Sequence, residues 1–433
     1  MENYAPTAVF YTLGCRLNQT ESAIMAKNLE EAGYRIVENK RKADLCVINT
    51  CTVTNRSDSK CRQSIRAVIK NNPRALVAVV GCFSQLAGEQ IKKLGGVNII
   101  LGNREKLRLS HYVEQAKYSS EPIVEVGTIS GNSFSISTIG QHLESTRANL
   151  KIQDGCNFHC SFCIIPSVRG RSRSREIDNI RQEAEALEHA GIKELVLTGV
   201  NIGTFRIDGA DIMALLDLFD GMKGIQRVRI SSIELKTVGT EIFALMKSAQ
   251  SKLVPYLHLP LQSGCDAILK AMRRRYIVAE YRDYVQEAKR QVPEICIGSD
   301  VIVGFPGETE EMFEETRHNL QRLPIHYFHV FPYAEKKGTK SAKMENRVRG
   351  SVISRRASVL RKLSEQKKAA FVDGFVGKSL EVLFEGNDTG DFWTGYTGNY
   401  IRVSVKSKTP LKNQIHMVTI TGSKNGRAFG QLK

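Results

Sequence analysis

The first 110 residues of the chain alternate between continuous apolar runs and amphipathic stretches. Three apolar runs, AVFYTLGC, ADLCVINTC and ALVAVVGC, are each followed by a segment whose apolar residues recur near helical spacing. Continuous apolar strands separated by helices are typical of a parallel sheet that is covered on both faces. The pattern therefore predicts an α/β protein whose N-terminal domain, residues 1–127, is a doubly wound parallel sheet.

A second alternating series begins after a stretch rich in Ser, Thr and Gly, residues 128–147, which we interpret as an interdomain linker. Roughly six strand–helix units follow, and they fit a partial (β/α) barrel. With a basic, helical extension, this central domain is predicted to span residues 148–368. Functional residues of such barrels lie at the carboxyl ends of the strands. Distinctive residues stand at five of these ends: Gly155-Cys156, Thr198-Gly199, Ser232–Glu234, Gln262-Ser263 and Gly304–Gly307.

Residues 369–433 change to short alternating segments with Gly-rich turns, which predicts a small antiparallel β-barrel. Such a module either binds RNA or stabilises the rest of the chain. For its aromatic residues, core packing is the expected role, ahead of base stacking. These aromatic residues are Phe392, Trp393, Tyr396 and Tyr400.

The formal net charge of +17 at pH 7 indicates a polyanionic partner, with nucleic acid favoured over an acidic membrane surface. More than half of the excess lies between Lys336 and Lys368, where twelve Lys and Arg stand against two Glu. Two shorter basic runs are Arg169–Arg175 and Arg273–Arg275. Charge runs are most often solvated faces, but three of them together favour a surface that contacts RNA.

The chain has no run of eighteen apolar residues and no basic-then-apolar N-terminal signal. We therefore expect a cytoplasmic protein without a membrane partner. In that compartment the ten cysteines remain thiols, so clustered cysteines point to metal or redox chemistry.

One such cluster is the stretch DGCNFHCSFCIIP, which places Cys156, Cys160 and Cys163 within eight residues. A structural zinc site usually takes four ligands, and no matching cysteine pair follows nearby. His159 or a distant cysteine could complete such a site, which keeps zinc as a minor alternative. A [4Fe–4S] cluster held by only three thiolates instead leaves one iron open for a reactant.

Three further cysteines, Cys15, Cys51 and Cys82, each stand at the predicted carboxyl end of an N-terminal strand. In a parallel sheet these ends share the edge at which open α/β sheets bind ligands. Cys46 and Cys61 are expected to pack as small hydrophobic residues instead. The first three have polar neighbours, which argues against a dry core and favours a second three-thiolate cluster. These neighbours are Asn18, Gln19, Asn49, Thr50 and Asn55.

The cysteine-rich stretch resembles the signature of the radical S-adenosylmethionine superfamily. With the N-terminal cysteines, the barrel and a terminal β-barrel similar to a TRAM domain, the chain resembles the methylthiotransferases over nearly its whole length. The resemblance implies two [4Fe–4S] clusters and S-adenosylmethionine, which serves as methyl donor and radical source. The barrel cluster would generate a 5′-deoxyadenosyl radical, and the N-terminal cluster would hold the sulfur that receives the methyl group. All six cluster cysteines would then be catalytic.

The resemblance also assigns positions around S-adenosylmethionine. Phe162 matches the aromatic position that the family uses near the adenine. The segments TGVNIG, SSIE, LPLQSG and SDVIVGFPGET match others that line the pocket. Each position could equally be a strand-end cap or turn residue. The further cofactor-binding positions carried over are Gly199, Asn201, Ser232, Glu234, Gln262, Asp300, Val303 and Gly304.

Three subgroups of the family differ in substrate. The segments around Cys15 and Cys156 look most like the type that modifies N6-threonylcarbamoyladenosine beside the anticodon of tRNA. Ser172-Arg173-Ser174 departs from the RGxExSR pattern of the type that modifies isopentenyladenosine. We therefore expect a tRNA methylthiotransferase of the first type. Its partners would be the anticodon region of tRNA, a reductant protein and a sulfur donor of unknown identity.

Other functions stay open. The substrate could be isopentenyladenosine in tRNA or an aspartate of a small-subunit ribosomal protein. A radical enzyme of another reaction type and a non-catalytic iron–sulfur protein that binds RNA are the rival classes. The basic run Arg169–Arg175 would either guide the RNA or offset the negative charge of the clusters.

Overall fold

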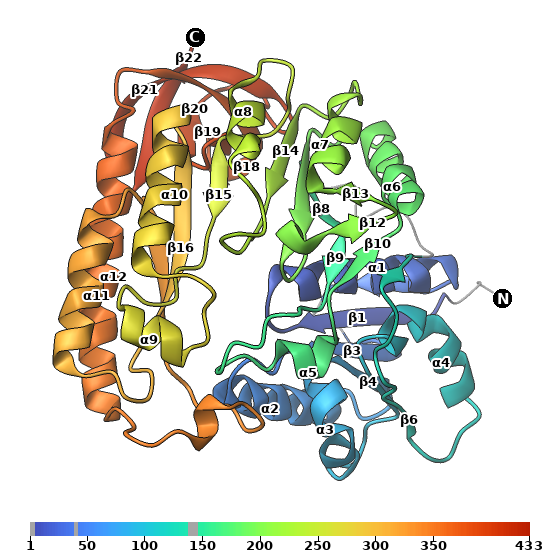
Figure 1. The fold of residues 1–433 in the computed structure, drawn as a ribbon. Helices are drawn as coiled ribbons and strands as arrows, with labels where there is room; N and C mark the ends of the chain where they lie inside the picture. Colours follow the sequence, from blue (N-terminus) through green and yellow to red (C-terminus); the bar gives the residue numbers. More distant parts are fainter. Residues whose placement is uncertain (1–4, 39–41, 137–145) are drawn as a thin grey trace.

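The computed structural model describes residues 5–38, 42–136 and 146–433 of the chain, which form three domains (Figure 1). The N-terminal domain contains a parallel sheet with the strand order β2-β1-β3-β4-β5-β6. Its strands are β1 (Thr7–Thr12), β2 (Arg35–Val37), β3 (Leu45–Thr50), β4 (Leu76–Gly81), β5 (Ile99–Leu101) and β6 (Ile123–Glu125).

Helices cover both faces of this sheet. Met25 and Leu29 of α1 (Arg16–Glu31) and Val113 of α4 (Leu109–Ala116) pack on one face. On the other face, Ile65 of α2 (Asn55–Asn71) and Phe83 of α3 (Cys82–Lys92) join the opposite side chains of the same strands. The predicted doubly wound domain is therefore confirmed, and its continuous apolar strands are buried from both sides.

The central domain contains six parallel strands in two sheets, β14-β11-β8 and β15-β16-β17. A bridge between Val228 and Leu253 links the two sheets, so the strands form an open partial barrel. The strands are β8 (Arg147–Lys151), β11 (Glu194–Thr198), β14 (Arg227–Ile230), β15 (Tyr256–His258), β16 (Cys296–Val303) and β17 (Tyr327–Pro332). The covering helices are α6 (Ile177–His189), α7 (Ile212–Asp220), α8 (Glu241–Lys247), α9 (Asp266–Ala271), α10 (Val278–Gln291) and α11 (Glu310–Arg322).

A small sheet precedes the barrel helices. It has the order β7-β10-β9, with β7 (Ser133–Phe134), β9 (Gln153–Asp154) and β10 (Arg173–Arg175). Strand β7 lies within the segment expected to be a linker, of which residues 137–145 fall outside the described part of the chain. The short helix α5 (Ile165–Arg169) follows the loop of the second cysteine set.

The C-terminal domain is a closed barrel with the strand order β18-β19-β20-β22-β21, as the alternating pattern predicts. Helix α12 (Gly350–Asp373) carries much of the basic segment and packs against β17, β21 and β22. No helix in the described residues is both long and apolar enough to cross a membrane. The barrel strands are β18 (Ser379–Thr389), β19 (Phe392–Thr397), β20 (Arg402–Lys406), β21 (Ile415–Lys424) and β22 (Arg427–Leu432).

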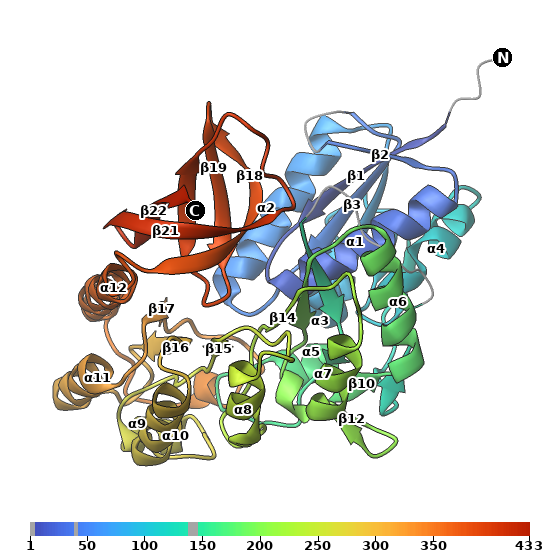
Figure 2. The ribbon, with the colours of Figure 1, turned by 90° about the horizontal axis from the view of Figure 1, so that it is seen from above.

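The aromatic residues of this barrel divide into two groups. Trp393 packs partly buried on the barrel core, and Phe392 is exposed. Tyr396 and Tyr400 instead stack on each other with ring centroids 5.0 Å apart and face the other two domains. Core packing therefore explains only one of the four. Figure 2 shows the N-terminal domain and the C-terminal barrel side by side over the same side of the central domain.

Candidate active site

The three N-terminal cysteines lie at the carboxyl ends of adjacent strands. Cys15 is the N-cap of α1 after β1, Cys51 directly follows β3, and Cys82 opens α3 after β4. The register of β3 and β4 aligns Thr50 with Gly81, so Cys51 and Cys82 follow at neighbouring points of one edge. The sheet topology thus brings together three residues that no local spacing connects.

Tight glycines allow this approach. Gly14 has φ +107°, and a Cβ there would lie 2.7 Å from the Cβ of Cys51 and 3.0 Å from its sulfur. Burial is the largest cause that raises the pKa of the Cys51 thiol, and the nearby Cys82 and Cys15 raise it further. The Nδ2 of Asn103 donates to the sulfur of Cys82 at 3.4 Å. The three thiols therefore share one polar site.

The second cysteine set lies in the loop between β9 and α5. The backbone N–H of Phe158 donates to the sulfur of Cys156 at 3.3 Å, and Nη1 of Arg274 donates to the sulfur of Cys160 at 3.3 Å. Burial raises the pKa of Cys156 to about 11 and that of Cys163 to about 12, and Cys160 adds to both shifts. The mutual effect of the thiols indicates that these three also converge.

The chemistry of both sets suits a [4Fe–4S] cluster. Each set offers three thiols, and cationic or amide donors point at the sulfurs, as thiolates require. No three His, Cys, Asp or Glu side chains in the described ranges converge tightly enough to hold a single ion, whereas a four-iron cluster is larger. The raised pKa values mean that metal binding must displace the thiol protons.

Arg274 belongs to a buried ion pair that the sequence did not reveal. Its side chain is 2% exposed and pairs with Glu234, which had been expected near S-adenosylmethionine. The Oδ1 of Asn201 accepts from the backbone N–H of Glu234 at 3.4 Å. The Nδ2 of Asn201 and the hydroxyl of Thr198 are buried without a hydrogen-bond partner in the described structure. Such orphaned groups fit a site that a polar ligand completes.

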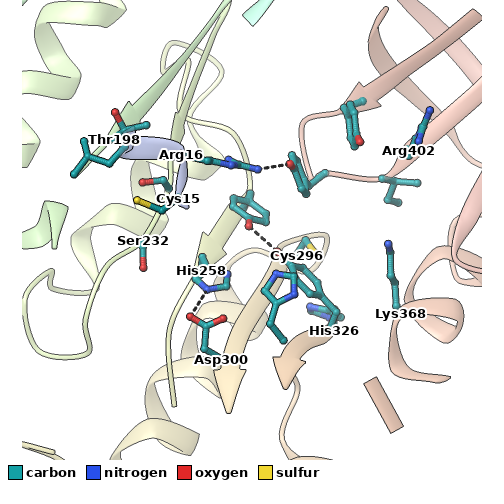
Figure 3. A pocket seen from close by; sticks show the side chains of 18 of the residues that line it. Cys15, Arg16, Thr198, Ser232, His258, Cys296, Asp300, His326, Lys368 and Arg402 are labelled. Atoms are coloured by element: carbon teal, nitrogen blue, oxygen red, sulfur yellow. Dashed lines mark hydrogen bonds and ion pairs between the residues drawn. The ribbon is translucent and has the colours of Figure 1, made fainter. Parts of the chain in front are cut away.

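A cavity of about 740 Å³ opens between all three domains. Cys15 lines it from the N-terminal domain, and Gly199, Ser232 and Asp300 line it from the central barrel. The Nε2 of His258 lies 3.1 Å from Oδ2 of Asp300, a contact that Figure 3 shows. The size and mixed lining of the cavity are typical of a site for a small ligand or a single nucleoside.

Six of the expected cofactor-binding positions do not line this cavity: Phe162, Asn201, Glu234, Gln262, Val303 and Gly304. Phe162 packs with a small apolar cluster around Met272, and Val303 is fully buried at the end of β16. Gln262 adopts φ +73° and exchanges backbone hydrogen bonds with β16. Asn201 accepts from the backbone N–H of Glu234, as described above. These six positions stay predictions for the S-adenosylmethionine pocket.

The basic run after the second cysteine set is largely internal, contrary to an RNA-facing role. The side chains of Arg169, Arg173 and Arg175 are buried, whereas Arg171 is exposed. The cause is pairing: Arg175 forms an ion pair with Glu183, and Arg169 and Arg173 join a buried network. Charged side chains are buried only when they are paired in this way.

This buried network joins the N-terminal and central domains around Glu21 of α1. Glu21 accepts from Lys106 at 2.5 Å, from Lys151 at 2.7 Å and from Arg169 at 2.9 Å. Asp154 pairs with Lys151 at 2.7 Å, with Arg169 at 3.0 Å and with Arg173 at 3.5 Å. Four cations therefore face two carboxylates, and Cys82 is among the groups that raise the pKa of Arg169.

Tyr400 of the C-terminal barrel also reaches this junction. It adopts φ +65°, and its hydroxyl accepts from Nη2 of Arg16 at 2.7 Å. The guanidinium of Arg229 lies 4.8 Å from the Tyr400 ring centroid. Arg16 directly follows Cys15, so the C-terminal barrel contacts the N-terminal domain beside its first cysteine.

Comparison with known families and relatives agrees with this arrangement. Residues 7–102 match the family described as "Uncharacterized protein family UPF0004", and residues 150–320 match the radical SAM superfamily. A threonylcarbamoyladenosine tRNA methylthiotransferase of Bacillus subtilis is 37% identical over 96% of this chain and 93% of its own. A second such enzyme, from Aquifex aeolicus, is 37% identical over 86% of this chain and 92% of its own. A tRNA-2-methylthio-N(6)-dimethylallyladenosine synthase of Acetivibrio thermocellus is 32% identical over 97% and 90%.

Solved structures share the fold at low sequence identity. The radical S-adenosylmethionine methyltransferase TsrM from Kitasatospora setae aligns with a TM-score of 0.56 at 13% identity, over 76% of this chain and 73% of that one. The cobalamin-dependent S-adenosylmethionine radical enzyme OxsB aligns with a TM-score of 0.51 at 10% identity, over 83% of this chain and 56% of that one. These likenesses concern the fold alone.

The family assignment rests instead on sequence identity. Because the chain is 37% identical to a methylthiotransferase over 96% of its length and matches the radical SAM superfamily, it belongs to the methylthiotransferase family of radical S-adenosylmethionine enzymes.

Proposed function

We propose that the chain transfers a methylthio group to C2 of N6-threonylcarbamoyladenosine beside the anticodon of tRNA. The observation that carries this proposal is the 37% identity, over almost the full length, to relatives named for that reaction. The two cysteine sets support it, because the reaction needs a sulfur donor and a radical source, and Cys15 of the first set lines the cavity between the three domains.

Six cysteines would hold the metal clusters, one set from each of the two domains. Cys15, Cys51 and Cys82 suit one [4Fe–4S] cluster, and Cys156, Cys160 and Cys163 suit the other. With S-adenosylmethionine bound, the two clusters supply the carbon-centred radical and the methylated sulfur that the reaction requires.

The protein's own groups prepare this site. Arg274 directs a donor at the sulfur of Cys160 and is held in place by Glu234. Thr198 and Asn201 offer buried donors that lack partners in the described structure, so a polar cofactor that meets them would be oriented.

The partners follow from the chemistry. The excess positive charge suits tRNA, and binding should weaken as salt rises. A reductant protein must provide electrons, and a sulfur donor must replace the transferred atom in each turnover. Because the substrate is tRNA, we expect the reaction to occur in the cytoplasm.

The direct test is mass spectrometry of nucleosides after an anaerobic reaction of the reconstituted full chain. Substrates would be tRNA carrying N6-threonylcarbamoyladenosine and, separately, tRNA carrying isopentenyladenosine. A 2-methylthio product from the first tRNA alone is the expected result. A product from the second tRNA alone would contradict the proposal and favour the dimethylallyladenosine reaction of the Acetivibrio thermocellus relative.

A further inference from the structure

The cavity between the three domains is strongly cationic on the side of the C-terminal barrel. Lys368 of α12, Arg402 of β20 and Arg427 of β22 line it there. Figure 3 shows Lys368 and Arg402 on one side of the cavity and Cys15 on the other. The family resemblance assigned none of these three basic residues to the site.

Two of these cations, Lys368 and Arg427, have little internal compensation. Among the described residues that line the cavity, Asp300 is the single carboxylate, and its Oδ2 lies 3.1 Å from Nε2 of His258. Neither Lys368 nor Arg427 forms an ion pair with any described residue. Positive charge that faces a cavity without a matching carboxylate is a site for an anionic ligand group.

Two of the cations are held next to each other. The aliphatic stem of Lys368 lies so close to Gly426 that a Cβ there would be 3.2 Å from its Cγ and Cδ. Gly426 directly precedes Arg427 and has φ +68°, a conformation that favours glycine. The turn between β21 and β22 therefore brings a lysine and an arginine to one side of the cavity.

The geometry of the nucleoside places its N6 substituent in the same cavity. In adenine, C2 and the N6 group lie on one edge of the base, where N1 links C2 to C6, the carbon that carries N6. A cavity that presents C2 to the Cys15 side must therefore also enclose the substituent. The threonylcarbamoyl group ends in a free carboxylate, whereas an isopentenyl group is uncharged and apolar.

We propose that Lys368 and Arg427 form the subsite that binds the carboxylate of the threonylcarbamoyl group, and that this subsite selects the substrate. The inference rests on the proposed function and deepens it. An uncharged substituent would remove water from these cations without offering them a partner, and this would weaken its binding strongly. A carboxylate instead gains charge-assisted hydrogen bonds from them.

The test measures RNA binding by the reconstituted full chain at one fixed salt concentration. Three fluorescent anticodon stem-loops are compared by anisotropy: one with unmodified adenosine, one with N6-threonylcarbamoyladenosine, and one with the methyl ester of its carboxylate. The wild-type chain should bind the free acid about tenfold more tightly than the ester, as expected for charged hydrogen bonds. Equal affinity for acid and ester would overturn the inference.

Variants then locate the effect. Lys368→Met and Arg427→Met should each reduce the acid-to-ester ratio several-fold, and Lys368→Arg should retain it. Lys362→Met is the matched control, because Lys362 is an exposed lysine of the same helix that does not line the cavity. If the cavity variants weaken all three RNAs equally, the residues contact phosphates and the subsite assignment is wrong.

Product analysis separates the two proposals. If the chain methylthiolates the free acid and the ester with equal kcat/KM, the carboxylate subsite fails while the proposed function stands. If the chain modifies isopentenyladenosine RNA alone, the proposed function fails as well.

Discussion

Replacing Glu21 by Gln should destabilise the contact between the N-terminal and central domains severely. Burial alone would raise the pKa of this carboxyl, but Arg169, Lys106 and Lys151 together hold it well below its ordinary value. The carboxylate is thus the anion at the centre of a network that is almost fully excluded from water. Its neutralisation leaves four buried cations against Asp154 alone.

The expected cost follows from that arrangement. Removing one partner from a buried ion pair costs about 3–5 kcal/mol, because the remaining charge is uncompensated. In a domain of this size that lowers the melting temperature by about 6 °C or more. Glu30→Gln is the matched control on the same helix: its ion pair with Lys27 spans 3.9 Å at the surface, where loss costs at most about 1 kcal/mol.

The assay combines thermal unfolding with hydrogen exchange of the α1 amides, which reports on the interface itself. Lys106→Met provides a second comparison, because it leaves three cations against two carboxylates and so should cost less than Glu21→Gln. The interpretation is refuted if Glu21→Gln destabilises no more than Glu30→Gln, or if Lys106→Met is the more damaging change.

Two further outcomes are expected. Gly14→Ala should lower the iron content by about half, because the new Cβ would lie 2.7 Å from the Cβ of Cys51. Gly33→Ala is the control: Gly33 also has a positive φ, +86°, but has open space around it, so the iron content should not change. Iron analysis of both variants tests this prediction. Burial lowers the pKa of His326 to about 3, and its Nδ1 accepts from the Ile297 amide at 2.9 Å. As the pH falls, the unfolded chain therefore binds a proton at His326 before the folded chain does, and the free energy of unfolding should fall by about 1.3 kcal/mol from pH 7 to 5.5. Urea unfolding at several pH values should show a smaller pH dependence for His326→Gln than for the wild-type chain. The same pH dependence in both would contradict this prediction.

The sequence pattern was sufficient for the architecture and for the position of three cysteines at one edge of the N-terminal sheet. Continuous apolar strands imply parallel sheets, and parallel strands place their carboxyl ends on one edge. The convergence of Cys15, Cys51 and Cys82 follows from that topology without any local motif. The burial of Cys46 and Cys61 was likewise expected and is confirmed.

What the pattern could not show is the pairing of charges across domains. Arg169 reads as part of a solvated basic run, but its partner Glu21 lies 148 residues earlier and meets it only in the folded chain. Arg274 was hidden in the same way within a run of three arginines. The position of Tyr400 depends on a left-handed backbone conformation and on domain docking, and neither leaves a periodic signal.

The most direct measurement is iron and acid-labile sulfide analysis, with Mössbauer spectroscopy, of the anaerobically reconstituted chain and two triple variants. The wild-type chain should hold about eight irons. Replacing Cys15, Cys51 and Cys82 by Ala should leave about four, with 5′-deoxyadenosine still formed but no methylthio product. Replacing Cys156, Cys160 and Cys163 should also leave about four and abolish 5′-deoxyadenosine. A wild-type content of about four irons, or full iron in either variant, would contradict two clusters each held by three cysteines.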